Sequence, residues 1–158
     1  MDMRRLFSVV ILIIGCAAFF NIQAQEEGKK IDRKKLPKAV EATVARESVG
    51  ATINGIGTEK EGGKTVYELE LMVNGLSKDM LIDKSGNILE VEQEVSMESL
   101  SEDVKAGLNR MAGKGSITKV VSLSKHDKLV AYEAAVTNGK KHSEIQVGPD
   151  GKKLASPE

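Results

Sequence analysis

Two stretches of the chain alternate apolar and polar residues with a period of two, which predicts strands with one buried face. Residues 67–73 read Tyr-Glu-Leu-Glu-Leu-Met-Val, and residues 132–136 read Tyr-Glu-Ala-Ala-Val. Each is followed by Asn-Gly, at 74–75 and 138–139, a strong signal for a two-residue hairpin turn. Further alternation over 79–83, 89–95 and 143–147, and earlier apolar stretches near 53–60 and 117–125, predict an antiparallel meander in each half of the chain.

A helical period precedes each set of strands. Residues 36–47 place Leu36, Val40 and Val44 on one face, with Pro37 at the expected first position and Gly50 as an expected stop. Within residues 100–111, Leu100, Val104, Leu108 and Met111 form an apolar stripe, and Gly113 should end this second helix. Ser99 and Glu102 have the spacing of a capping box before this second helix.

The two halves match each other feature by feature. Leu36 and Leu100 are 64 residues apart, as are the two Asn-Gly pairs, whereas Tyr67 and Tyr132 are 65 apart. We therefore predict a tandem duplication, with units over residues 36–95 and 96–155. Each unit should have one helix and a meander of about four strands, with the helices on one face of the sheet, which is an α+β fold.

The first 24 residues have the layout of a secretory signal peptide. A basic start is followed by fifteen apolar residues, 6–20, fewer than the ~20 that a spanning helix needs. Cleavage after Ala24 would release a periplasmic or secreted chain. The alternative uses Ile13-Ile14-Gly15-Cys16, which resembles a lipobox, and would leave lipidated Cys16 as a membrane anchor. An uncleaved anchor is a third, less favoured case. Residues 25–35 are charged and lack apolar periodicity, so we expect a flexible tether there.

Composition narrows the functional classes. The 158 residues carry 23 basic and 23 acidic side chains and no Trp, so overall charge gives no argument for nucleic acid binding. Phe occurs only at positions 7, 19 and 20. A folded part with two tyrosines as its only aromatics is poorly suited to stack a planar cofactor, and we predict no cofactor.

A helix, a strand with Tyr-Glu, an Asn-Gly pair and a closing Asp-x-x-Gly turn follow one another along the chain in this order. The order is carried by residues 36–40, Tyr67-Glu68 and 83–89, and again by Tyr132-Glu133 and Asp150-Gly151-Lys152. It resembles the PepSY-like family in its β-lactamase-inhibitor-protein-like branch, over residues 35–154. The resemblance implies a bacterial envelope protein with two repeats in one helix-backed sheet, and some members of the family bind and inhibit enzymes. The second unit departs from the pattern, because Gly148 stands where the first has Asp83.

No catalytic or metal-binding constellation stands out. Beyond residue 24 the histidines are His126, in an expected turn, and His142, and neither has the partners that nucleophilic catalysis or metal binding requires. Neighbouring Tyr and Glu on a strand point to opposite faces, which argues against a joint acid–base role. We therefore expect no enzymatic activity and no metal site.

The polar positions of the strands instead predict an acidic sheet face opposite the helices. We expect this face to bind a protein with a basic patch, with regulation or inhibition of a hydrolase as the functional class. The alternative is a periplasmic module that binds a small ligand or a cation. Lys and Arg should lie mainly in the tether, helices and loops. The predicted binding residues are Glu68, Glu70, Asp79, Glu90, Glu92, Glu94, Glu133 and Glu144, with Asp83 and Gln146 on the same face.

Overall fold

A computed structural model describes residues 29–158, which form one antiparallel sheet with two helices. Eight strands follow one another in chain order across the sheet. The strands are β1 (Lys29–Lys30), β2 (Thr52–Glu61), β3 (Lys64–Val73), β4 (Leu76–Ile82), β5 (Ile88–Glu94), β6 (Ser116–Lys125), β7 (Lys128–Asn138) and β8 (Lys141–Val147). The helices are α1 (Lys38–Glu47) and α2 (Glu102–Ala112), and short 3₁₀ turns occupy Arg33–Lys35 and Met97–Ser99. The predicted α+β class is confirmed.

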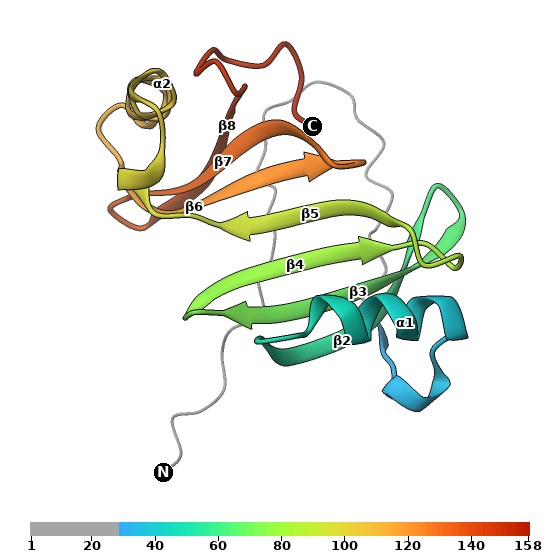
Figure 1. Ribbon diagram of the computed structural model, residues 1–158. Coiled ribbons are helices and arrows are strands. Elements are labelled where there is room, and N and C mark those ends of the chain that lie inside the picture. The colour runs from blue at the N-terminus through green and yellow to red at the C-terminus, as the bar shows by residue number, and fades with distance from the viewer. Residues whose placement is uncertain (1–28) are drawn as a thin grey trace.

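Both helices cover the same face of the sheet, and each covers its own part (Figure 1). Helix α1 lies over β2 and β3, and α2 lies at the other end beside β7 and β8. Two separate apolar cores result. One joins Val40 and Val44 to Leu69, Leu71, Met80 and Ile82. The other joins Leu100, Val104 and Leu108 to Val120, Ala134 and Val147.

The helix-then-meander order occurs twice, but the two halves differ in strand number. Strands β2–β5 follow α1, whereas only β6–β8 follow α2. The fourth strand expected in the second unit is reduced to a single bridge between Val147 and Lys153. The first hairpin prediction is confirmed, because Asn74 and Gly75 have φ of 52° and 84° between β3 and β4, as a tight two-residue turn requires. The second hairpin is also present, but its turn lies one residue later than predicted. Asn138 is the last residue of β7 and pairs with Lys141, so the turn is made by Gly139, with φ of 61°, and Lys140.

The helix ends agree with the sequence prediction only in part. Pro37 is the N-cap rather than the first helical residue, and Ser48 rather than Gly50 is the C-cap of α1. Ser101, not Ser99, caps α2 by accepting a hydrogen bond from the Val104 N–H, since Met97–Ser99 already forms a turn of its own. Gly113 ends α2 with φ of 59°, as predicted.

The expected tether is structured over its described part. Lys29 and Lys30 pair with Gly57 and Thr58 of β2. The 3₁₀ turn that follows is tied to α1 by an ion pair between Arg33 and Glu41 at 2.7 Å. The flexible-tether prediction is therefore wrong for residues 29–35. These residues are held by contacts with β2 and α1, which the periodicity of the segment itself does not indicate. The predicted cleavage site and Cys16 lie outside the described residues.

Candidate functional site: the open acidic face

The side of the sheet away from the helices, which we call the open face, carries all eight glutamate and aspartate residues predicted to bind a partner. Directly opposed residues on neighbouring strands share a face, so the register places the side chains. One row runs Glu70–Asp79–Glu92–Leu123–Ala131 across β3 to β7, and its neighbours run Glu68–Leu81–Glu90–Lys125, Glu94–Val121–Glu133–Gln146 and Lys119–Ala135–Glu144. The residues named from the sequence are thus brought together on one surface.

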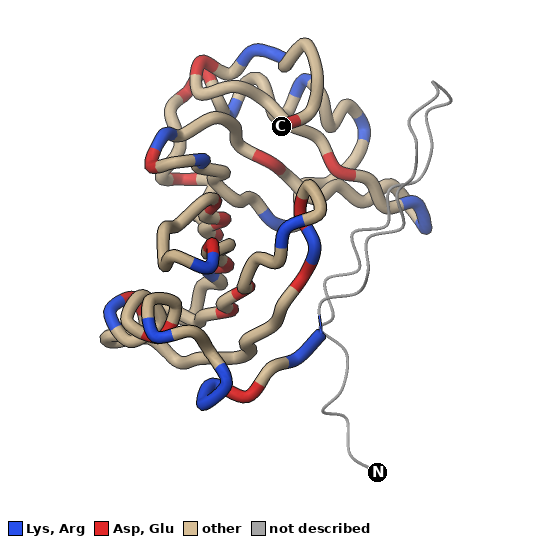
Figure 2. Tube along the Cα trace, turned by 90° about the vertical axis from the view of Figure 1, so that its right-hand side faces the viewer, with Lys and Arg blue, Asp and Glu red and all other residues tan. Residues whose placement is uncertain are grey.

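The sheet is bent, and the open face is the inner side of the bend. Figure 2 looks along the strands and shows acidic positions following one another across the middle of the sheet, with α1 on the outer side. Gly55 and Gly57 of β2 lie opposite Glu70 and Glu68. These glycines leave room for the two carboxylates, since an added Cβ at Gly55 would lie 2.7 Å from a Glu70 carboxylate oxygen.

This crowding changes the acidity of the central carboxyls. Burial, followed by repulsion from Glu133, Glu90 and Asp79, raises the pKa of Glu92 to about 7. Burial and repulsion from Glu70, Glu59 and Asp79 raise the pKa of Glu68 to about 6.

The same effect extends over the rest of the face. Burial is the main cause of the raised pKa of Asp79, Glu90 and Glu144. The open face thus holds several carboxyls that would ionise more readily if a positive charge approached.

Two lysines also lie on the open face, contrary to the expectation that basic residues avoid it. Lys119 and Lys125 of β6 point to this side, where Lys119 lies 3.7 Å from Glu94 and Lys125 lies 3.8 Å from Glu90. Both pairs cross the junction between the two halves of the sheet. The sequence signal was ambiguous, because β6 changes register after Ile117 and a bulge inverts the face of the residues beyond it.

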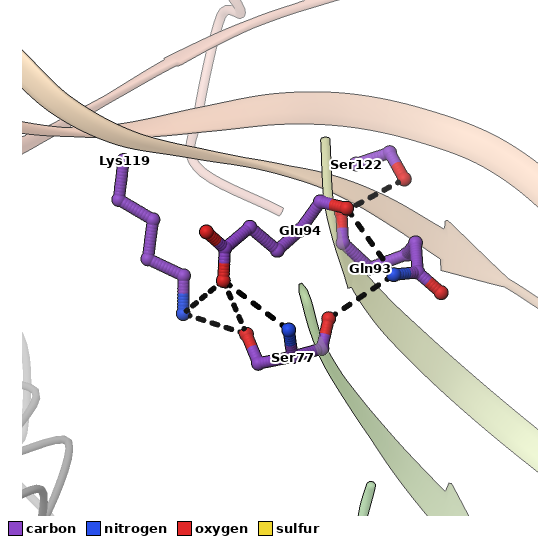
Figure 3. A network of polar contacts seen from close by, with 5 residues as sticks. All are labelled: Ser77, Gln93, Glu94, Lys119 and Ser122. Atoms are coloured by element: carbon purple, nitrogen blue, oxygen red, sulfur yellow. Dashed lines mark hydrogen bonds and ion pairs between the residues drawn. The ribbon is translucent and has the colours of Figure 1, made fainter. Parts of the chain in front are cut away.

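The backbone pairing of β4 with β5 runs only as far as Lys78 and Gln93. Beyond it, around Glu94, side-chain hydrogen bonds connect the two strands (Figure 3). The Glu94 carboxylate accepts hydrogen bonds from the N–H and hydroxyl of Ser77 at 3.2 and 3.0 Å. Lys119 donates to the same hydroxyl at 2.8 Å, and the Gln93 amide donates to the Ser77 carbonyl at 3.1 Å. The network joins the two halves and fixes Glu94 in place, which gives this residue a structural role beside the predicted binding role.

Asp83 does not join the open face as expected. Its carboxylate accepts hydrogen bonds from the N–H groups of Ser85 and Asn87 and from the Asn87 amide, at 2.8 to 2.9 Å. These bonds lower its pKa and close the β4–β5 turn, a local side-chain bond that aspartate favours at turns. His126 lies in the β6–β7 turn, as predicted.

No cluster of three or more His, Cys, Asp or Glu within residues 29–158 is placed to hold a metal ion. None of the helices between residues 29 and 158 is long and apolar enough to span a membrane.

Comparison with known proteins shows that the chain is similar to several solved structures in fold. No protein-family model matches the chain, and no curated protein matches it in sequence. A DUF2874 family protein from Bacteroides ovatus superposes with a TM-score of 0.60 at 17% identity, covering 76% of this chain and 85% of that one. A BLIP-like protein from Bacteroides fragilis gives 0.57 at 20% identity, covering 75% and 83%. The chain has a BLIP-like fold.

A third structure of this fold, from Bacteroides eggerthii, is provisionally described as periplasmic. It gives a TM-score of 0.62 at 13% identity, over 75% of this chain and 86% of that one. At such low identities the likeness establishes the BLIP-like architecture and leaves the binding function open. It agrees with the architecture that the resemblance to the PepSY-like family implied, while no family model confirms that family itself.

Proposed function

We propose that this chain is a non-catalytic bacterial envelope protein that binds another protein through its open face and so regulates or inhibits a hydrolase. The observation that supports it best is the concentration of poorly compensated carboxyls on the inner side of a bent sheet that no described helix covers. Placing like charges on adjacent strands costs stability, and a basic partner would relieve that cost. Periplasmic location is supported by the signal-like segment over residues 1–24 and by the provisional description of a protein of the same fold.

A basic partner would also affect the carboxyls with raised pKa values and contact the apolar residues between them. Its positive charge would lower the raised pKa values of Glu68 and Glu92, so that binding near pH 6.5 releases protons. Apolar residues between the carboxyls, among them Leu81 and Ala135, would supply contact area at the centre. Such an arrangement gives charge complementarity for partner choice together with some apolar burial for affinity.

The test is a comparative capture from bacterial envelope extract. The bait is residues 25–158, and the test variant carries Glu→Gln at 68, 70, 90 and 92. A matched control carries Glu→Gln at 41, 47, 98 and 102, which removes the same charge from the helical side. We expect the unchanged bait and the control to capture a protein that the open-face variant does not capture. Equal retention by all three baits would place binding elsewhere and contradict the proposal.

The alternative of a cation-binding module has a separate test. Calcium or zinc would raise the unfolding temperature of residues 25–158 by mass action only if the folded chain binds it. The open-face variant would abolish that rise and the helical-side control would keep it. An unfolding temperature that does not change at millimolar calcium or zinc would eliminate this alternative.

A further inference from the structure

The second half of the sheet ends where the first half adds one more strand. In the first half, Ile82 lies opposite Ile88, and the Asp83 N–H donates to the Asn87 carbonyl at 2.9 Å. In the second half, Val147 lies opposite Lys153, and the Gly148 N–H donates to the Lys152 carbonyl at 2.8 Å. Both pairs of contacts are related by the same offset of 65 residues. The chain thus begins a counterpart of β5 beside β8 and does not continue it.

After Lys153 the chain leaves the edge of β8 and crosses to the open face. The Glu158 N–H donates to the side-chain oxygen of Gln146 at 2.9 Å, and its carboxylate lies 3.7 Å from Lys125. Residues 155–157 are Ala-Ser-Pro, whereas the counterparts in β5 are Glu90-Val91-Glu92. Ala and Pro are depleted in strands and Val is favoured, which explains why this segment does not pair with β8.

Among residues 29–158, the outer edge of β8 is therefore left without a paired strand over most of its length. Apart from the bridge at Val147, no strand within residues 29–158 pairs with this edge. Successive N–H groups of a strand point to opposite edges. Since the Gly148 N–H points outward to Lys152, the N–H groups of Gln146, Glu144 and His142 point outward as well. His142 and Glu144 are also exposed to solvent.

We propose that the outer edge of β8 binds an extended segment of another protein, which pairs antiparallel at the position that β5 occupies against β4. Main-chain hydrogen bonds to such an edge provide affinity, and the alternate side chains of the incoming segment provide selectivity. This site lies at the edge of the sheet and adjoins the open face at Glu144, and it does not depend on the function proposed above.

The first half of the sheet indicates the chemistry of the incoming segment. Val91 of β5 lies opposite Met80 over the first core, so the segment presents an apolar residue beside Ile145, which packs on the second core. Glu92 lies opposite Asp79, and the corresponding residue would lie opposite Glu144. Glu133 lies on the same face as Glu144, and burial followed by repulsion from Glu133 raises the pKa of Glu144. A basic residue therefore suits this position and an acidic one does not.

A peptide copied from this chain is the probe. It has the sequence of residues 86–94 with Glu90→Lys and Glu92→Lys, and a second peptide keeps both glutamates. Amide hydrogen exchange of residues 25–158 is followed by NMR with each peptide. In the free protein the amides of His142, Glu144 and Gln146 should exchange quickly, and those of Ser143 and Ile145 slowly. The lysine peptide should protect the three fast amides, with an affinity about tenfold higher than the glutamate peptide.

Two variants connect the effect to the edge. Glu144→Pro removes an outward N–H but no N–H that faces β7, and edge strands accept such a proline, so it should abolish protection. Glu144→Lys keeps the edge intact and should reverse the preference between the two peptides, which tests the proposal even if Glu144→Pro does not fold. The open-face Glu→Gln variant should still bind the lysine peptide, so that failure of the two proposals can be told apart.

Three results would overturn the proposal. One is that neither peptide protects these amides at millimolar concentration. Another is that protection appears on β2 or on the open face instead of β8. The last is that the three amides are already protected in a concentration-dependent way without peptide, which would identify a second copy of this chain as the occupant.

Discussion

Glu92 lies in the middle of β5 with Asp79 directly opposite it, and its pKa of about 7 couples stability to pH. An unfolded glutamate ionises near pH 4.5, so the folded state binds a proton more tightly than the unfolded state does. Its contribution to stability is complete below about pH 4.5 and is lost as the pH rises through 7. Asp83 and Asp150 have lowered pKa values, so the stability that they contribute is present above about pH 3.8 and is lost only as the pH falls below it.

The first prediction is that the unfolding free energy is larger at pH 5.5 than at pH 8. Glu92→Gln should raise stability at pH 8 by about 1–2 kcal/mol and reduce the difference between the two pH values. Urea unfolding at both pH values measures this. Glu102→Gln is the control, because that carboxylate is 90% exposed. A wild-type chain that is more stable at pH 8 would contradict the raised pKa values.

At the scale of elements, each closing turn packs against the helix of its own half. Gly86 approaches the Ala39 carbonyl of α1, and Thr43 donates to the Gly86 carbonyl at 2.7 Å. In the second half the contact is closer, because Gly107 of α2 lies directly against Gly151. The positive φ of 71° at Gly151 keeps this turn compact. Two glycines therefore determine how near α2 lies to the end of β8.

The second prediction concerns Gly107. A glycine-to-alanine change inside an exposed helix usually stabilises a protein by up to ~1 kcal/mol. Here the added methyl would overlap the Gly151 carbonyl, so Gly107→Ala should destabilise by about 1–3 kcal/mol. Asn109→Ala, at an exposed position of the same helix, should be neutral or slightly stabilising. Chemical denaturation of both variants gives the comparison, and an unaffected Gly107→Ala would mean that α2 can move away from the turn.

Some elements could be predicted from the sequence and others could not. Strand β3 and its Asn74-Gly75 turn follow from local alternation and turn chemistry, and the structure confirms both. Strand β1 could not be predicted, because Lys29 and Lys30 are extended only through pairing with β2. The face of Lys119 depends on the bulge in β6. The acidic rows were predicted because alternation within each strand fixes them, whereas the pKa of Glu92 depends on the bend of the whole sheet.

At the scale of the molecule, two apolar cores share one sheet without sharing residues. The halves meet along β5 and β6, where Gln93 lies opposite Ser122 and Glu90 opposite Lys125. This junction is mainly polar on both faces. A chain organised in this way resembles a short repeat protein, in which each unit has its own stability and a nearest-neighbour interface joins the two.

The third prediction is that damage to one core remains largely within its half. Leu71→Ala and Leu108→Ala each remove a fully buried side chain, and each should cost about 2–5 kcal/mol. Leu108→Ala should speed amide exchange across α2, β7 and β8 much more than across α1, β3 and β4, and Leu71→Ala should do the reverse. Hydrogen exchange followed by mass spectrometry measures both patterns. If either variant speeds exchange equally in both halves, the β5–β6 junction transmits stability fully, and the bend of the open face is then maintained by the sheet as one cooperative unit.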